Sequence, residues 1–336
     1  MNDGSDARIS KEIKTLSQDF DIDFLGIGKN DDDLGIKAFV HNYKCIIGSH
    51  RSVKILLKYL VLLKSLDRKS YDAVYVVDEQ LLIFVLPLIK RCYVILDLFD
   101  SMFLKLNKEG NKWIWLKKIL YNRMKKVIVT DQHRFDLLPD FIKDRAFVLP
   151  NYPEQQEFGK KRFNEGKIVL GVFGTLTRER GLGFLETLLE RNSDIEVHCA
   201  GWLGDQYAKE FVHGSSVKYL GIMDKDEVNK YVYHFIDLVV AIYPQSNMNN
   251  YNASPTKLYD AIMSKTPVIM NRWVRISSFV EEINAGMVVE LNSIGVNNLH
   301  FQDLKNYLES YSHSVFHEIS MKYSWNDFEE RYLELF

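Results

Sequence analysis

The chain has 336 residues and a net charge of −2, and its apolar and charged fractions are ordinary for a soluble globular enzyme. This length favours two domains, and the near-neutral charge argues against wholesale binding to nucleic acid. The three cysteines lie far apart without metal-ligand spacing, and the polar start Met1–Asp6 is no signal peptide. We therefore expect a cytoplasmic protein that needs no metal or other cofactor.

Strands alternate with helices along residues 1–150, which predicts a parallel sheet covered on both faces. The expected helices are 7–20, 51–66, 80–90 and 113–126, and the expected strands are 21–27, 37–43, 74–77, 93–98, 127–130 and 147–150. A doubly wound domain normally opens with an apolar strand, whereas this chain opens on a polar stretch. Either the start codon is called late, or the first domain lacks its first strand.

The segment 151–161, with Pro153 and mixed charge, is the expected linker to a second α/β unit. In that unit we expect strands at 167–174, 195–200, 217–220, 238–243, 267–270 and 287–291, with helices between them and terminal helices over 301–336. The predicted fold class is α/β, with two Rossmann-like doubly wound domains, 1–150 and 151–336, facing a cleft. The last helix can return to the first domain. Ligands of such sheets bind at the carboxyl ends of the strands.

The stretch 249–268 predicts a loop that becomes a helix aimed at an anion. Ser254 is a good N-cap and Pro255 suits the first helical position. The N–H groups of Thr256 and Lys257 then point out of the helix start, where the helix dipole and the lysine charge favour an anion. Asp260 shares their face. A cation followed by a carboxylate suits a diphosphate and a sugar diol, and the alternative is an ordinary capped helix.

A second anion-binding turn is predicted at 171–181, between a strand and a helix. Gly174 lets the backbone approach a ligand closely, and Arg178 and Arg180 offer charge-assisted bonds to phosphate. The glycine spacing fits neither a dinucleotide fingerprint nor a P-loop. In a doubly wound domain this turn and the one at Ser254 lie at the same edge of the sheet, so we expect them to converge on a pyrophosphate.

Four passages carry a resemblance to a known family. They are Val148-Leu-Pro-Asn151, Val172-Phe-Gly-Thr-Leu176 with Arg180-Gly181, Ala241–Pro244 through Ala253–Asp260 to Thr266–Ile269, and Tyr323-Ser-Trp325. Through them the chain resembles the retaining nucleotide-sugar glycosyltransferases of the GT-B fold, family four. The branch it resembles acts in surface-polysaccharide assembly, such as that of capsule or O-antigen.

The resemblance implies roles for particular residues. Asp260 would hold the ribose hydroxyls, and Lys257 and Arg180 would stabilise charge on the leaving nucleotide. The other residues that the resemblance places at the donor are Gly174, Thr175, Tyr243, Ser254, Pro255 and Thr256. The family's first acid lies eight residues before its second, and here that position is Asn252, which we keep as a catalytic candidate. Asparagine can bond a sugar hydroxyl but carries no charge.

On the acceptor side the matching loop contains Asp3, Gly4 and Asp6, and Asp97 and Asp100 flank a second loop. Many relatives have histidine where this chain has Phe99. The alternative for Asp97 and Asp100 is a simple turn at the end of a strand.

The segment 105–126 carries eight Lys or Arg residues against one Glu, with Trp113, Trp115 and Tyr121 among them. Tryptophan and tyrosine favour the bilayer interface, and basic residues favour anionic lipid. Either this face docks on the inner membrane, or Trp113, Leu116 and Leu120 pack inward and the lysines are merely solvated.

The sequence thus predicts an enzyme that moves a sugar from a UDP- or GDP-linked donor to a glycan, with retention of configuration. The expected acceptor is lipid-linked. One alternative is a non-catalytic relative that binds a nucleotide sugar or glycan, which Asn252 and Phe99 favour. Another is a nicotinamide-dependent oxidoreductase, against which the glycine spacing at 171–174 argues.

Overall fold

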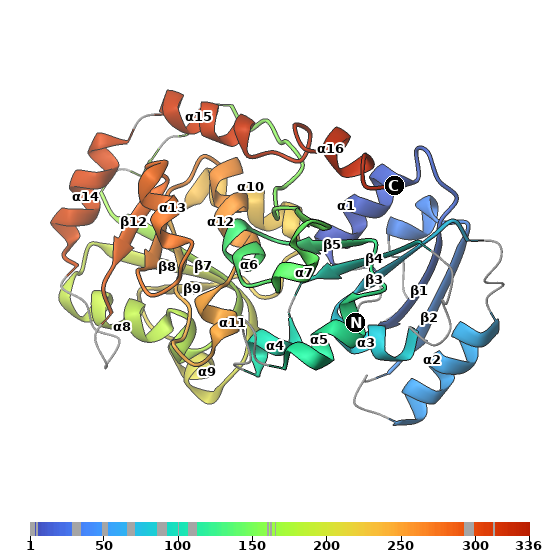
Figure 1. Ribbon diagram of the computed structural model, residues 1–336. Coiled ribbons are helices and arrows are strands. Elements are labelled where there is room, and N and C mark those ends of the chain that lie inside the picture. The colour runs from blue at the N-terminus through green and yellow to red at the C-terminus, as the bar shows by residue number, and fades with distance from the viewer. Residues whose placement is uncertain are drawn as a thin grey trace. The chain divides into compact units, whose positions relative to one another are not determined.

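The computed structural model describes residues 4, 6–28, 35–48, 53–65, 71–85, 93–99, 101–106, 113–159, 161, 163–164, 166–291, 299–311 and 313–336. The chain divides into two compact units (Figure 1). Unit 1 consists of Met1–Pro150 together with Phe328–Phe336, and unit 2 consists of Asn151–Asp327. The end of the chain therefore belongs to the same unit as its beginning.

Unit 2 is built on a six-stranded parallel sheet in the order β12-β11-β10-β7-β8-β9. Its strands are β7 (Ile168–Leu176), β8 (Ile195–Leu203), β9 (Val217–Tyr219), β10 (Leu238–Ala241), β11 (Val268–Asn271) and β12 (Gly286–Val289). Every residue of β10 and β11 is buried, because helices cover both faces. The sheet grows from β7 to β8 on one side and to β10 on the other, so the topological switch point lies between β7 and β10.

The helices of unit 2 form two layers, one on each face of this sheet. They are α8 (Leu182–Arg191), α9 (Gln206–Phe211), α10 (Lys225–Phe235), α11 (Met248–Tyr251), α12 (Thr256–Met263), α13 (Ser277–Glu282), α14 (Phe301–Ser310) and α15 (His313–Lys322). Alternate residues of β7 pack into the hydrophobic cores on the two faces of the sheet. Leu170 packs with Leu185 of α8, and Val169 packs with Leu258 of α12.

Unit 1 contains two parallel sheets. A two-stranded sheet pairs β1 (Asp23–Gly28) with β2 (Asn42–Ile47), and a four-stranded sheet has the order β3-β4-β5-β6. These four strands are Ala73–Val77, Tyr93–Leu98, Lys126–Val129 and Ala146–Val148. In the doubly wound order 3-2-1-4-5-6, β2 and β1 correspond to strands 3 and 2, and β3 corresponds to strand 4. Among the described residues no strand joins β1 to β3.

The helices of unit 1 cover the two faces of its sheets (Figure 1). They are α1 (Ala7–Leu16), α2 (Val53–Ser65), α3 (Glu79–Val85), α4 (Met102–Lys105), α5 (Ile114–Tyr121), α6 (Gln132–Asp136), α7 (Asp140–Lys143) and α16 (Glu329–Leu333). α16 returns to unit 1 beside α1. Its Tyr332 is fully buried, Glu329 accepts a hydrogen bond from Thr15, and the Phe336 ring stacks 6.1 Å from that of Tyr75.

The strand expected at 37–43 starts too early in the prediction. A 3₁₀ helix, η1 (Gly35–Phe39), comes first, and β2 begins only at Asn42. Ile36 and Val40, four residues apart, pack against α1, so helical spacing decides the local structure. The expected linker is also less free than its composition indicates. Lys161 donates to the carbonyls of Val232 and Ile236, which fixes it to unit 2.

Candidate functional site

Arg180 lies at the carboxyl edge of the unit 2 sheet, just after β7. The strand ends at Leu176, and a 3₁₀ turn, η2 (Arg178–Arg180), follows. Thr177 caps this turn because its hydroxyl accepts from the Arg180 N–H at 3.2 Å. Gly181 continues with φ +109°, a conformation that side chains disfavour. The turn brings Arg180 to the switch point.

Lys257 approaches the same place from the first turn of α12. Its Nζ donates to the carbonyl of Phe173 in β7 at 3.1 Å. The ring of Tyr243, just after β10, lies 5.9 Å from Lys257 Nζ and 5.7 Å from Arg180 Cζ. The structure therefore brings these three predicted residues together. Arg178 instead lies 5.1 Å from the ring of Tyr207, so only one of the two predicted arginines joins them.

The charge at this cluster is unbalanced. In the part of the chain that the structure describes, neither Arg180 nor Lys257 forms an ion pair with a carboxylate. Burial, together with the neighbouring Arg180 guanidinium, lowers the pKa of Lys257 to about 8. Two cations held close together without an acid favour an anionic ligand, because a bound anion relieves their repulsion.

Tyr243 is held by a residue that the sequence analysis missed. Asn271, buried at the end of β11, accepts from the Tyr243 N–H and donates to the Tyr243 carbonyl, both at 3.0 Å. A lone Asn after an apolar run gives no signal of such a role. The contact between Asn271 and Tyr243 forms because β10 and β11 are neighbours in the sheet, which the sequence alone does not reveal.

Gly174 and Thr175 are exposed near the end of β7, which extends two residues beyond the predicted strand 167–174. Gly174 has φ +98°, and a side chain there would meet nothing within 4 Å. Its neighbour in β8 is Gly201, where an added Cβ would lie only 1.9 Å from the Gly174 carbonyl oxygen. The two backbones thus approach closely and leave open space above Gly174.

The start of α12 differs from the prediction by one residue. The helix begins at Thr256, and Pro255 instead of Ser254 occupies the N-cap position. Pro255 lacks an N–H but its carbonyl accepts the Leu258 N–H at 3.1 Å, so it can precede the helix as well as open it. The Ser254 carbonyl accepts from the Asn151 side chain at 2.7 Å, which ties this turn to residues after the unit boundary.

Asp260 lies one turn after Lys257 on α12. Its Oδ1 is 3.0 Å from Nζ of Lys225, at the start of α10, and its side chain is 17% exposed. The sequence analysis did not single out Lys225, because 35 residues separate the pair. The carboxylate is therefore close to the cationic cluster along the helix but has its own cation.

Asn252 is almost fully buried at the end of α11. Its Nδ2 donates to the carbonyl of Met248 at 2.9 Å, and Nη1 of Arg275 lies 3.5 Å from its Oδ1. The amide therefore closes the short helix α11, a role in which a carboxylate could not donate.

The acceptor-side candidates of unit 1 have structural partners. Asp97 is fully buried and accepts from Arg8 and from the Tyr75 hydroxyl, at 2.8 and 2.6 Å. Burial raises the pKa of Asp97, and the Arg8 guanidinium opposes that rise. It is a buried ion-pair partner, and not part of an exposed turn. Phe99, in the place of the family's histidine, lies 4.3 Å under the same guanidinium.

Two other acceptor-side candidates, Asp6 and Gly4, make contacts at the start of α1 and with Ile36. The Asp6 side chain accepts from the N–H groups of Arg8 and Ile9 and so caps α1. Gly4 has φ +93° and touches Ile36 so closely that no Cβ fits. Asp3 and Asp100 lie outside the described residues.

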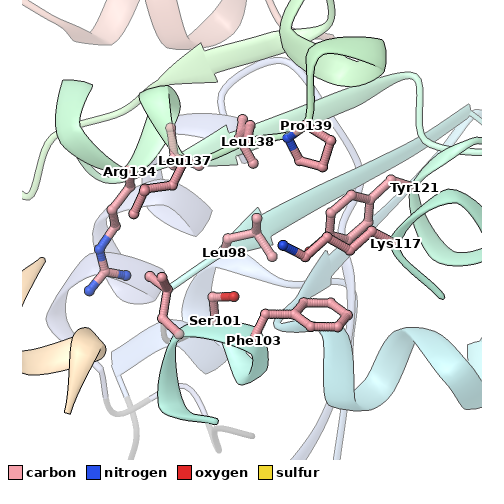
Figure 2. Close-up of a pocket in the computed structure, with 11 residues that line it drawn as sticks. Leu98, Ser101, Phe103, Lys117, Tyr121, Arg134, Leu137, Leu138 and Pro139 are labelled. Atoms are coloured by element: carbon pink, nitrogen blue, oxygen red, sulfur yellow. The ribbon is translucent and has the colours of Figure 1, made fainter. Parts of the chain in front are cut away.

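Unit 1 has a cavity of about 30 Å³ at the ends of β4 and β5 (Figure 2). Lys117 points into it, with Nζ 4.9 Å from the Phe103 ring, and Leu98, Ser101 and Arg134 also line it. It has room for about two water molecules, so it does not hold a sugar as it stands. Of the acceptor-side candidates that the structure describes, Gly4, Asp6 and Asp97, none lines it.

The described residues were considered as metal ligands and as membrane-spanning helices. They contain no group of three or more His, Cys, Asp or Glu side chains placed to hold a metal ion. None of the helices in the described parts of the chain has the length and apolar character needed to cross a bilayer.

Comparison with known proteins places the fold. Sucrose-phosphate synthase from Thermosynechococcus elongatus is similar over 98% of this chain and 91% of its own, with a TM-score of 0.73 and 11% identity. Its fold is GT-B. Anabaena Alr3699/HepE in complex with UDP-glucose matches over 92% of this chain and 90% of its own, with TM-score 0.63 and 14% identity. A glycosyltransferase from Rickettsia africae matches over 99% of this chain and 94% of its own, with a TM-score of 0.63 and 13% identity.

These likenesses confirm the predicted fold class, which is α/β with two Rossmann-like domains of the GT-B fold. No family model matches the chain, and no curated protein matches it. At such low identity the shared property is the GT-B fold itself.

Proposed function

We propose that this protein is a glycosyltransferase that moves a sugar from a UDP- or GDP-linked donor to a glycan. The observation that supports this most is the pair Arg180 and Lys257, which share the Tyr243 ring at the switch point and form no ion pair with a carboxylate among the described residues. A diphosphate would neutralise both cations. As the bond to the sugar breaks, negative charge grows on that diphosphate, and fixed cations lower the barrier.

The neighbouring residues extend this proposal. The open backbone at Gly174 would let a phosphate approach β7, and Asp260, beside Lys225, would accept from the ribose hydroxyls. Retention of configuration and membership of family four follow from the sequence motifs and remain part of the proposal. A lipid-linked acceptor in surface-polysaccharide assembly would bring the protein to the inner face of the membrane, where segment 105–126 would contact it.

A second candidate is a non-catalytic subunit that binds a nucleotide sugar. Asn252 favours it, since the chain has a buried amide where the family has an acid. The two functions differ in one measurement. Purified protein is mixed with UDP- and GDP-sugars, with and without membrane extract, while nucleotide binding and nucleotide release are both followed.

Release that depends on the extract supports the transferase, and binding without release supports the non-catalytic subunit. If no nucleoside diphosphate binds at up to millimolar concentration, both proposals are wrong. A bound ligand at about one hundred times its dissociation constant stabilises a protein by about 2.7 kcal/mol, which a thermal-shift assay detects.

Substitution tests the roles of the two cations. Lys257→Ala and Arg180→Ala should each lower turnover by about 10²–10³-fold, the usual cost of removing one donor to a developing anion. Arg178→Ala is the matched control, because its guanidinium lies over Tyr207 and should leave turnover within about twofold. Thermal unfolding verifies that each variant is folded. Full activity in both alanine variants would contradict the assigned roles.

A further inference from the structure

The outward face of α2 carries only apolar and basic side chains. Val53, Leu57 and Val61 are spaced by four residues and are 70%, 56% and 67% exposed. Exposed lysines flank them at positions 54, 58 and 64, and the helix contains no acidic residue. Single exposed apolar residues are common, but a regular stripe of them on one helix indicates a contact surface.

α5 repeats this arrangement. Trp115 and Ile119, again four residues apart, are 57% and 59% exposed, and Trp113 just before the helix is 43% exposed. Lys118 is exposed beside them, and this helix also lacks an acidic residue. Leu120 and Tyr121 point inward. Lys117 is buried too, so it adds nothing to the basic surface that segment 105–126 predicted.

The two helices belong to the same layer of unit 1. Tyr59 of α2 and Leu120 of α5 pack into one core, together with alternate strand residues such as Ile27, Val76 and Leu96. The intervening strand residues face α1 on the opposite side, as Val77 does. Figure 1 shows α2, α3 and α5 on one side of the strands of unit 1 and α1 on the other. The exposed stripes of α2 and α5 therefore look outward from the same side.

We propose that the outward faces of α2 and α5 together dock unit 1 on the surface of an anionic phospholipid bilayer. Lysines beside apolar residues suit a surface that offers acyl chains and negative headgroups, and tryptophan favours that interface. A second copy of this chain fits less well. A symmetric contact would place lysines against lysines, with no acid on either helix to pair with them.

This proposal adds α2 to the membrane contact, and it does not depend on the nucleotide-sugar site. The test is flotation with vesicles of phosphatidylcholine alone or with roughly one third phosphatidylglycerol. The wild type should float with the anionic vesicles, and about 0.5 M salt, which shortens the screening length to a few ångströms, should release it. Neutral vesicles should retain little protein.

The paired variants Leu57→Glu/Val61→Glu on α2 and Trp115→Glu/Ile119→Glu on α5 should each lower the bound-to-free ratio by about tenfold or more. Phe235→Glu, at a 49% exposed position of unit 2, is the matched control and should float as the wild type does. All these side chains are exposed, so the variants should fold, and nucleotide binding in solution should be unchanged.

Three outcomes would overturn the proposal. The wild type does not bind anionic vesicles, or the α2 variant floats as well as the wild type, or sedimentation shows a dimer that the α2 variant dissociates. In the last case the surface joins two copies of the chain. Since nucleotide binding is measured without vesicles, a failure here leaves the proposed transferase activity intact, and loss of that activity leaves the docking result intact.

Discussion

Lys257 is the residue on which the charge of the candidate site depends. The residue is half-buried, and its ammonium donates to the Phe173 carbonyl and lies near a second cation. Both burial and Arg180 disfavour its protonated form, so the pKa of Lys257 falls to about 8. A diphosphate favours the protonated form, and binding must therefore raise that pKa again.

This gives a pH prediction. Above pH 8 the unliganded protein has lost the Lys257 proton, and it must take one up to bind a nucleoside diphosphate. The affinity should then fall by up to about tenfold per pH unit, and remain level below pH 8. Titration calorimetry at several pH values, in two buffers of different ionisation heat, measures both the affinity and the proton uptake.

Lys257→Arg is the control for that titration, because a guanidinium stays charged throughout this range. It should remove the fall in affinity above pH 8. A wild-type affinity that does not change between pH 7 and 9.5 would show that Lys257 does not contact the ligand.

At this scale the sequence located the cations but not the residues that support them. Arg180 closely follows β7, and Lys257 lies in the first turn of α12, in the connection that follows β10, so chain order alone places both at the carboxyl edge of the sheet. Lys225 and Asn271 act through partners 35 and 28 residues away in the chain. Their roles depend on which elements become neighbours, and no local pattern carries that information.

At the scale of elements, a buried ion pair joins α1 to β4. Arg8 donates to both oxygens of Asp97 and to Glu12, and the Tyr75 hydroxyl donates to both acids. The docking of α1 thus accounts for the burial of Asp97. Removing one partner leaves a buried charge unpaired, whereas replacing both with apolar side chains costs less.

We therefore predict that Arg8→Ala lowers the free energy of unfolding of unit 1 by about 3–5 kcal/mol. Arg8→Met combined with Asp97→Leu should be less destabilising than Arg8→Ala alone. Urea unfolding of the single and double variants measures the coupling between the two side chains. If the double variant is fully stable yet turnover is lost, Asp97 has a direct role in the reaction.

The errors in element prediction have local causes. The stretch 37–43 has no glycine or proline to mark a turn, and only the contact of Ile36 with α1 selects a 3₁₀ helix. The boundary at Pro255 was one residue off because proline suits both the N-cap and the first helical position. The strands of unit 2 were easier to predict, since short continuous apolar runs are typical of buried parallel strands.

At the scale of the whole molecule, unit 1 is completed by residues from the far end of the chain. Tyr332 of α16 is fully buried there, and burial raises its pKa well above the usual range. The chain therefore passes from unit 1 to unit 2 after Pro150 and back again before Phe328. The fold class followed from alternating strands and helices, but this return was foreseen only as an option.

Tyr332→Ala should destabilise unit 1 by about 3–5 kcal/mol, the usual cost of truncating a buried aromatic side chain. For a unit of this size, that corresponds to a fall of roughly 10 °C in the midpoint of its thermal transition. Glu334→Ala, on the exposed side of the same segment, should leave the midpoint within about 2 °C. Differential scanning calorimetry measures both. Equal midpoints in the two variants would mean that α16 does not contribute to unit 1.

The return of Phe328–Phe336 to unit 1 has a consequence during biosynthesis. The ribosome makes most of unit 1 first, but the residues that finish it emerge only after all of unit 2. Unit 2 can fold as soon as it leaves the exit tunnel. Unit 1 cannot complete its fold until then, because the surface around Tyr75 stays uncovered until Phe336 is made. We expect chaperones to bind nascent unit 1 during this interval. A premature stop codon near the 3′ end of the message would therefore destabilise unit 1, although most of that unit is encoded at the 5′ end.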